Sequence, residues 1–171
     1  KLLKNDKVNF IKDFKKIIKD LTSKLKLRND VLVHRDFHVS NLMLVKDRIG
    51  IIDSQDALIG NRAYDLASLI DDVRLQTSKS FKKRLYNFYL SKQKKINKKK
   101  FKNDFEILSV LRNLKIIGIF TRLAIRDGKV KYLKLIPHAW KLISFRIKKN
   151  NVFNDLDNLL TKNFKRELNA N

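Results

Sequence analysis

The stretch Val31-Leu-Val-His-Arg-Asp-Phe-His-Val-Ser-Asn-Leu-Met-Leu-Val45 decides the fold of this chain, together with Ile49-Gly-Ile-Ile-Asp53 just after it. Within these runs an acid, Asp36, is followed by an amide, Asn41, and then by a second acid, Asp53. Amide and carboxylate oxygens are ligands that Mg²⁺ accepts, and a carboxylate can also accept a proton. The stretch therefore predicts a polar site held between short apolar segments.

The apolar residues around these polar groups predict short β-strands. Val31–Val33 is expected to form a buried strand that enters the polar loop. Leu42–Val45 and Ile49–Ile52 are expected to form a β-hairpin. The hairpin would be closed by Lys46-Asp47-Arg48. Such a hairpin would carry the amide and the second acid to the same end.

The spacing of Asp36 and Asn41 matches H-R-D-x-x-x-x-N, the catalytic-loop pattern of phosphoryl-transfer enzymes. That reaction needs a carboxylate beside the attacking hydroxyl and oxygen ligands that hold Mg²⁺ against a triphosphate. An isolated His-x-Asp is usually an ordinary loop. The full spacing, followed by Asp53 after an apolar strand, favours the catalytic interpretation.

Three blocks carry a resemblance to a known family: His34-Arg-Asp-Phe-His-x-x-Asn-Leu-Met43, Ile52-Asp-x-Gln-Asp-Ala57 and Tyr64-Asp-Leu-Ala-Ser-Leu69. In this order they resemble the aminoglycoside phosphotransferase-like family, small-molecule kinases that share the protein-kinase fold. Within it, the chain is similar to bacterial kinases of cell-wall amino sugars such as N-acetylmuramate and N-acetylglucosamine. The match is specific for the family and less specific for the substrate.

The resemblance implies a role for each matching residue. Asp36 looks like the catalytic base, and Asn41 and Asp53 look like the Mg²⁺ ligands. Met43 and Ile52 look like the apolar floor beneath the adenine of ATP. The implied cofactors are therefore ATP and Mg²⁺.

Further residues of the loop have roles that the resemblance suggests or leaves open. His38 stands where kinases often place a group that touches the transferring phosphate, although loop packing explains it equally well. Asp65 resembles the buried acid that braces the catalytic loop through backbone N–H groups. His34 is expected to brace the loop as well. Arg35 stands where many small-molecule kinases have Gly.

The spacing of apolar residues predicts helices around the loop and hairpin. Asn61 is a candidate cap for the second of them, and Asp127-Gly128 is expected to end the fourth. The expected ranges are Val8–Leu27, Ala63–Leu75, Ser80–Leu90, Phe101–Arg126, Tyr132–Ile147 (broken or started near Pro137) and Leu156–Leu168.

This order of elements predicts an α+β, mostly helical fold that looks like the C-terminal lobe of a protein-kinase-like fold, with residues 1–171 as a single domain. Only four glycines occur, and no two are close enough to form a phosphate-covering loop. No Val-Ala-x-Lys strand precedes Val31. We therefore expect that the N-terminal lobe is missing and that the chain is a fragment, with little activity alone.

A formal net charge of +23 is the strongest argument for another class of protein, because basic surfaces attract nucleic acid. The lysines are spread along the whole chain, and the run Lys92–Lys100 lacks interleaved aromatic residues. A coding bias toward Lys and Asn explains them, so nucleic-acid binding is not expected. With 17 acidic against 40 basic residues, a neutral or anionic sugar is favoured over a polycationic aminoglycoside.

The sequence therefore predicts a phosphotransferase that moves the γ-phosphate of ATP to a hydroxyl of a small sugar or amino sugar. The alternative is a non-catalytic pseudokinase or basic binding module of the same fold. A protein kinase is disfavoured because no activation segment separates Asp53 from the helix expected at Ala63. The chain has no cysteine and no apolar run that could span a membrane, so a cytoplasmic setting without membrane contact is expected.

Overall fold

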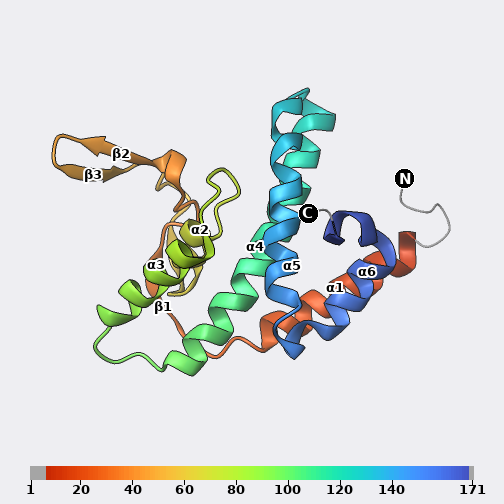
Figure 1. Ribbon diagram of the computed structural model, residues 1–171, viewed down its shortest axis with the longest axis horizontal. Helices are drawn as coiled ribbons and strands as arrows, with labels where there is room; N and C mark the ends of the chain where they lie inside the picture. Colours follow the sequence, from red (N-terminus) through yellow and green to blue (C-terminus); the bar gives the residue numbers. More distant parts are fainter. Residues whose placement is uncertain (1–6, 170–171) are drawn as a thin grey trace. The chain divides into compact units, whose positions relative to one another are not determined.

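The computed structural model describes residues 7–169, which fold as two compact units (Figure 1). One unit is Lys26–Arg112, which contains the loop and all the described strands. The other combines Lys1–Leu25 with Asn113–Asn171 and is helical where it is described. The predicted α+β, mostly helical class is confirmed.

The unit Lys26–Arg112 contains two small antiparallel sheets beside a group of helices. Its elements are β1 (Asn29–Val33), η1 (Val39–Asn41), β2 (Leu42–Val45), β3 (Arg48–Ile51), β4 (Leu58–Asn61), α2 (Tyr64–Ile70), α3 (Lys79–Ser91) and the first half of α4 (Lys98–Asp127).

The predicted hairpin is confirmed as β2 and β3, in which Leu42 pairs with Ile51 and Val45 with Arg48. Arg48 therefore belongs to the strand, and the turn is shorter than expected. Lys46 makes this tight turn with a positive φ of 53°.

The sequence did not predict β4, which pairs with β1 through Leu32↔Ile59 and Val33↔Leu58. The segment is short, and Gly60 interrupts its apolar pattern, so local preference for a strand is weak. Gly60 is suited to the pairing, because a Cβ there would lie 3.1 Å from Cγ2 of Val33. Contact with β1 therefore decides the conformation of β4.

Helix α2 ends earlier than predicted, at Ile70 instead of Leu75. Asp71 leaves the helical conformation (φ −107°, ψ 38°), and Asp72 accepts a hydrogen bond from the backbone N–H of Arg74 at 3.0 Å. Asn61 is not the cap itself; it lies in β4, where its Oδ1 accepts from the N–H of Ala63 at 3.0 Å.

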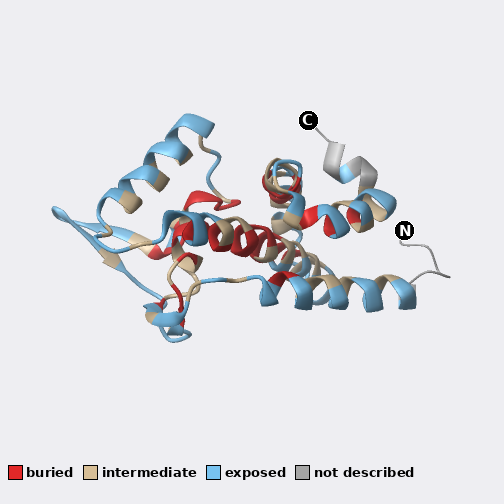
Figure 2. Ribbon diagram, turned by 90° about the horizontal axis from the view of Figure 1, so that it is seen from below, coloured by how far each residue is buried: buried red, intermediate tan, exposed pale blue. Residues whose placement is uncertain are grey.

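The first half of α4 supplies the largest buried side chains of this unit, among them Phe101, Phe105 and Ile107. In Figure 2, buried residues follow one another along this helix, while α3 and the hairpin are mostly exposed. Tyr86 of α3 packs on Phe105, with ring centroids 4.9 Å apart. The face of α4 that holds this core also carries buried polar residues.

The helical unit packs mainly through α1, α5 and α6. The apolar core between them includes Leu21, Trp140, Ile143, Leu156 and Leu160. Its elements are α1 (Lys7–Ser23), the second half of α4, η2 (Val130–Leu135), α5 (Ile136–Ile147), η3 (Asn151–Phe153) and α6 (Asn154–Asn169).

The boundaries of these helices differ from the predictions by a few residues. Helix α1 ends at Ser23, before the expected Leu27, where the Ser23 hydroxyl donates to the carbonyl of Asp20. Helix α4 ends at Asp127 as predicted, because Gly128 has a φ of 65°. Pro137 lies in the first turn of α5, which confirms a helix start there.

Candidate functional site

One carboxylate of α2, that of Asp65, accepts hydrogen bonds from the backbone of the loop that follows β1. Asp65 accepts a hydrogen bond from the N–H of His34 at 2.7 Å through Oδ2, and from the N–H of Arg35 at 3.0 Å through Oδ1. This confirms the predicted contact of Asp65 with the loop backbone. Two charge-assisted bonds fix the residues just before Asp36.

Arg35 has a left-handed backbone conformation, with a φ of 73°. A side chain is strained there, whereas Gly adopts this conformation without strain. The guanidinium donates to the backbone carbonyl of Asp56 at 3.3 Å. Arg35 thus connects the loop after β1 to the turn after Asp53.

Asn41 connects the first acid with the second. Its Nδ2 donates to the backbone carbonyl of Asp36 at 3.0 Å and lies 3.4 Å from Oδ2 of Asp53. The carbonyl of Asn41 accepts from the N–H of Ile52 at 3.1 Å, which brings the end of the hairpin to the loop. The predicted meeting of Asn41 and Asp53 is confirmed.

The chemistry of this pair fits a hard cation. The side-chain Nδ2 of Asn41 donates to the Asp36 carbonyl. The side-chain Oδ1 of Asn41 is therefore the atom that could bind a cation. Asp53 offers a carboxylate in an exposed left-handed turn (φ 68°), where Gln55 donates to its Oδ1. Among residues 7–169 no cluster of three or more His, Asp or Glu side chains could hold a metal. Mg²⁺ is compatible with two protein ligands, since phosphate and water complete its shell.

Asp36 lies in the middle of this loop and is half-buried. Within the described part of the chain, its backbone carbonyl accepts hydrogen bonds from Nδ2 of Asn41 and from the N–H of His38, both at 3.0 Å. The backbone is thus anchored while the carboxylate is left for another partner. This is the arrangement that a proton acceptor requires.

His38 is only 7% exposed. Burial lowers the pKa of His38, and the positive charge of Arg74 lowers it further, while Asp72 opposes the shift. The imidazole is therefore neutral at pH 7. Its Nδ1 is buried and makes no hydrogen bond within the described chain. The catalytic role of His38 stays a prediction.

Met43 and Ile52 lie at the base of the hairpin and are 50% and 46% exposed. Both side chains are exposed enough to contact a planar ligand ring. Their proposed contact with the adenine of ATP stays a prediction. The imidazole of His34 is 3.0 Å from the carbonyl of Ile52, so His34 braces the loop against the hairpin as expected.

Sequence reasoning missed several buried ionisable residues of the unit Lys26–Arg112. Asp72 accepts from the N–H of Val39 at 3.2 Å and pairs with Arg74 at 3.2 Å. Asp104 and Arg112 are 0% and 5% exposed on α4. The Asp71-Asp72 doublet directly after an apolar helix was a usable signal, whereas nothing local distinguishes Asp104 or Arg112 from exposed helical residues.

Comparison with known proteins agrees with this geometry. The model of a family described as a phosphotransferase enzyme family matches residues 2–97, more than half of the chain. The chain therefore belongs to the phosphotransferase enzyme family, as the three sequence blocks indicated.

Three curated relatives share the name N-acetylmuramate/N-acetylglucosamine kinase. That of Neisseria meningitidis serogroup B is 43% identical over 113 residues, 63% of this chain and 34% of the relative. That of Caulobacter vibrioides is 34% identical over 115 residues (64% and 32%). That of Pseudomonas aeruginosa is 32% identical over 136 residues (76% and 40%). This chain thus matches about a third of the length of these relatives.

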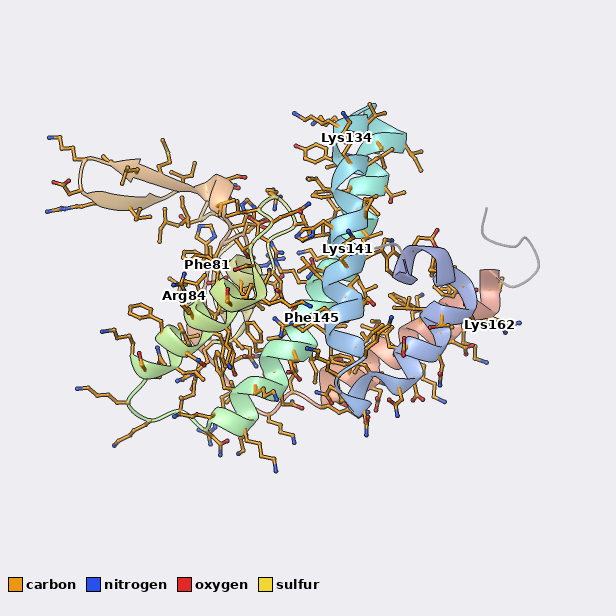
Figure 3. The ribbon with its side chains drawn as sticks, in the orientation of Figure 1. Phe81, Arg84, Lys134, Lys141, Phe145 and Lys162 are labelled. Atoms are coloured by element: carbon orange, nitrogen blue, oxygen red, sulfur yellow. The ribbon has the colours of Figure 1, made fainter. Side chains whose placement is uncertain are left out.

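No helix within residues 7–169 is both long and apolar enough to cross a bilayer. The exposed cations are also not gathered on one element. Figure 3 shows Lys134, Lys141 and Lys162 on η2, α5 and α6 of the helical unit, whereas Arg84 lies on α3 of the other unit. This spread is consistent with a general basic character.

Proposed function

We propose that this chain is the C-terminal lobe of a small-molecule kinase that transfers the γ-phosphate of ATP, with Mg²⁺, to a hydroxyl of an amino sugar. The observation that carries the proposal is the linked group of Asp36, Asn41 and Asp53, in which one amide hydrogen-bonds to the loop carbonyl and lies beside the second acid. The names of the curated relatives support the amino-sugar acceptor.

Each residue has a distinct part in the proposed reaction. The Asp36 carboxylate orients the acceptor hydroxyl and takes its proton as the oxygen attacks. The oxygens of Asn41 and Asp53 would hold Mg²⁺, and Asp65 keeps the loop rigid. When bound, ATP supplies the phosphoryl group and Mg²⁺ neutralises its charge. Met43 and Ile52 would support the adenine, and use of ATP implies a cytoplasmic setting.

Two substitutions separate these roles in the full-length gene product. Asp36→Asn should leave Mg²⁺–ATP affinity unchanged and lower turnover by about 100-fold or more, because it removes the proton acceptor. Asp53→Asn should weaken Mg²⁺–ATP binding. We would measure phosphorylation of N-acetylmuramate, N-acetylglucosamine and an aminoglycoside, and nucleotide binding by calorimetry. Asp47→Asn, in the exposed hairpin turn, is the control.

The two substitutions can also contradict these roles. An equal loss of nucleotide affinity in both variants would contradict the assignment. The absence of both turnover and Mg²⁺–ATP binding in the wild type would favour the second candidate, a non-catalytic module of the same fold.

A further inference from the structure

The short helix η1 begins with a backbone N–H group, that of Val39, which the helix itself cannot satisfy. The first N–H groups of a helix have no partner within it. His38, the residue before η1, makes no side-chain cap hydrogen bond. Instead, Oδ2 of Asp72 accepts from the N–H of Val39 at 3.2 Å. A carboxylate from a distant part of the chain therefore takes the place of the helix cap.

The carboxylate of Asp72 is itself held in one orientation. It lies just after α2, which ends at Ile70, and it is 1% exposed. Its Oδ1 accepts from the N–H of Arg74 at 3.0 Å and from the guanidinium Nη1 of Arg74 at 3.2 Å. This ion pair offsets part of the cost of burying the charge. Because Oδ1 is fixed by Arg74, Oδ2 is directed at Val39.

Two carboxylates thus hold the loop after β1, one on either side of Asp36. Asp65 accepts from the two N–H groups that precede Asp36. Asp72 accepts from an N–H group two residues before Asn41. Both carboxylates belong to α2 and the turn that follows it. The backbone between the proposed base and the proposed metal ligand is therefore anchored at both ends from one element.

The position of Val39 is transmitted directly to Asn41. Helix η1 is a single turn of three residues, and the carbonyl of Val39 accepts from the N–H of Leu42 at its end. The N–H of Asn41 donates to the carbonyl of His38 at 2.9 Å. A displacement of the Val39 peptide would therefore move the backbone of Asn41, and with it the side-chain oxygen that is the proposed Mg²⁺ ligand.

We propose that Asp72 is a positioning residue for the metal-binding half of the loop. It holds the N–H of Val39 and thereby places the side-chain oxygen of Asn41, without contact to the metal, the nucleotide or the acceptor. The consequence for Mg²⁺ rests on the proposed function, whereas the effect on the loop backbone does not. Removal of a group that orients a metal ligand commonly lowers metal affinity about 10- to 100-fold.

Substitution of Asp72 in the full-length gene product tests this role. Asp72→Ala should raise the Mg²⁺ concentration for half-maximal turnover about 10-fold, and saturating Mg²⁺ should restore turnover to within about threefold of the wild type. Hydrogen exchange measured by mass spectrometry should become about 10-fold faster in residues 38–42, since one hydrogen bond is lost. Residues 33–36 should stay protected by Asp65. Asp72→Asn keeps one side-chain oxygen and should show smaller changes of the same kind, which preserves the test if the Ala variant does not fold.

Asp65→Asn is the matched comparison, because it weakens the anchor on the other side of Asp36. Its turnover should fall without recovery at high Mg²⁺, and Asp47→Asn in the exposed hairpin turn should change neither quantity. A loss of turnover in the Asp72 variants that saturating Mg²⁺ does not restore would overturn the proposal, as would unchanged exchange in residues 38–42. If the wild type phosphorylates no sugar, the proposed function fails and exchange alone decides: faster exchange confined to residues 38–42 supports the positioning role, and no local change overturns it.

Discussion

Residues with strained backbone conformations lie beside the candidate site residues of this chain. Arg35 and Asp53, with φ values of 73° and 68°, lie beside Asp36 and after the hairpin. A left-handed conformation costs a side chain about 1–2 kcal/mol. Such strain persists where the surroundings hold the backbone, as Asp65 does for Arg35 and Asn41 does for the end of the hairpin.

The strain at Arg35 can be measured by comparing two substitutions. Both Arg35→Gly and Arg35→Ala remove the bond to Asp56, but only Gly adopts a positive φ without strain. We expect the Gly variant to have a free energy of unfolding about 1 kcal/mol larger than that of the Ala variant. Urea denaturation followed by circular dichroism measures the difference.

The matched control is Lys83, an exposed position inside α3. At this position the Ala variant should have a free energy of unfolding about 1 kcal/mol larger than that of the Gly variant, because the backbone is helical. An Ala variant at position 35 that is as stable as the Gly variant would mean that the loop relaxes away from this conformation.

At the scale of elements, one carboxylate of α4 joins three segments of the unit Lys26–Arg112. Asp104 accepts from the N–H groups of Lys26 and Leu27, each at 2.8 Å, and from Nδ2 of Asn61 at 2.7 Å. It thus holds the segment before β1 and the end of β4 to the helix. Asp104 thereby fixes both chain segments that flank the small sheet of β1 and β4.

Removal of this carboxylate should be costly. Asp104→Ala leaves buried donors unsatisfied, each worth about 1–3 kcal/mol, so we expect a loss of about 3 kcal/mol or more in the free energy of unfolding. Asp104→Asn keeps one acceptor oxygen and should lose less. Chemical denaturation measures both, with Asp47→Ala in the exposed hairpin turn as a control that changes stability by less than about 0.5 kcal/mol. A loss for Asp104→Ala no larger than the control's would show that Asp104 does not hold these segments.

At the scale of the whole molecule, each unit has its own apolar core. Phe101 and Phe105 are central in one, and Trp140, Leu156 and Leu160 in the other. The single tryptophan of the sequence therefore reports on the helical unit. The basic charge of +23 does not select a site on either unit, because it is distributed over many exposed positions.

The packing of Leu156 in the core of the helical unit can be tested by substitution. Leu156 is fully buried (0% exposed), so Leu156→Ala should lower the free energy of unfolding by about 2–5 kcal/mol through lost burial and a cavity. Denaturation followed by the fluorescence of Trp140 measures this. Val130→Ala, at a position that is 65% exposed in the same unit, should change it by less than about 0.5 kcal/mol. A similar shift in both variants would show that Leu156 is not part of a packed core.

Much of the candidate site was predictable because it depends on local sequence. The spacing from Asp36 to Asn41 and the short apolar runs on either side are enough to predict the loop, the hairpin and the approach of Asp53. The helices follow from periodic apolar residues, and Gly128 marks the end of α4. Helix ends were less accurate, as at α2, because side-chain contacts of Asp71 and Asp72 end that helix.

The sequence by itself therefore determined the family, the loop and hairpin that hold the candidate site residues, and the order of the helices, because these depend on local spacing and periodicity. Only the tertiary structure decided the pairing of β4 with β1, the contacts of Asp104 with Lys26, Leu27 and Asn61, and the burial of Arg112. These features join residues distant in the chain, such as Asp104 with Lys26, and a buried charge has the same local pattern as an exposed one. Which groups a buried charge contacts depends on how distant parts of the chain pack together.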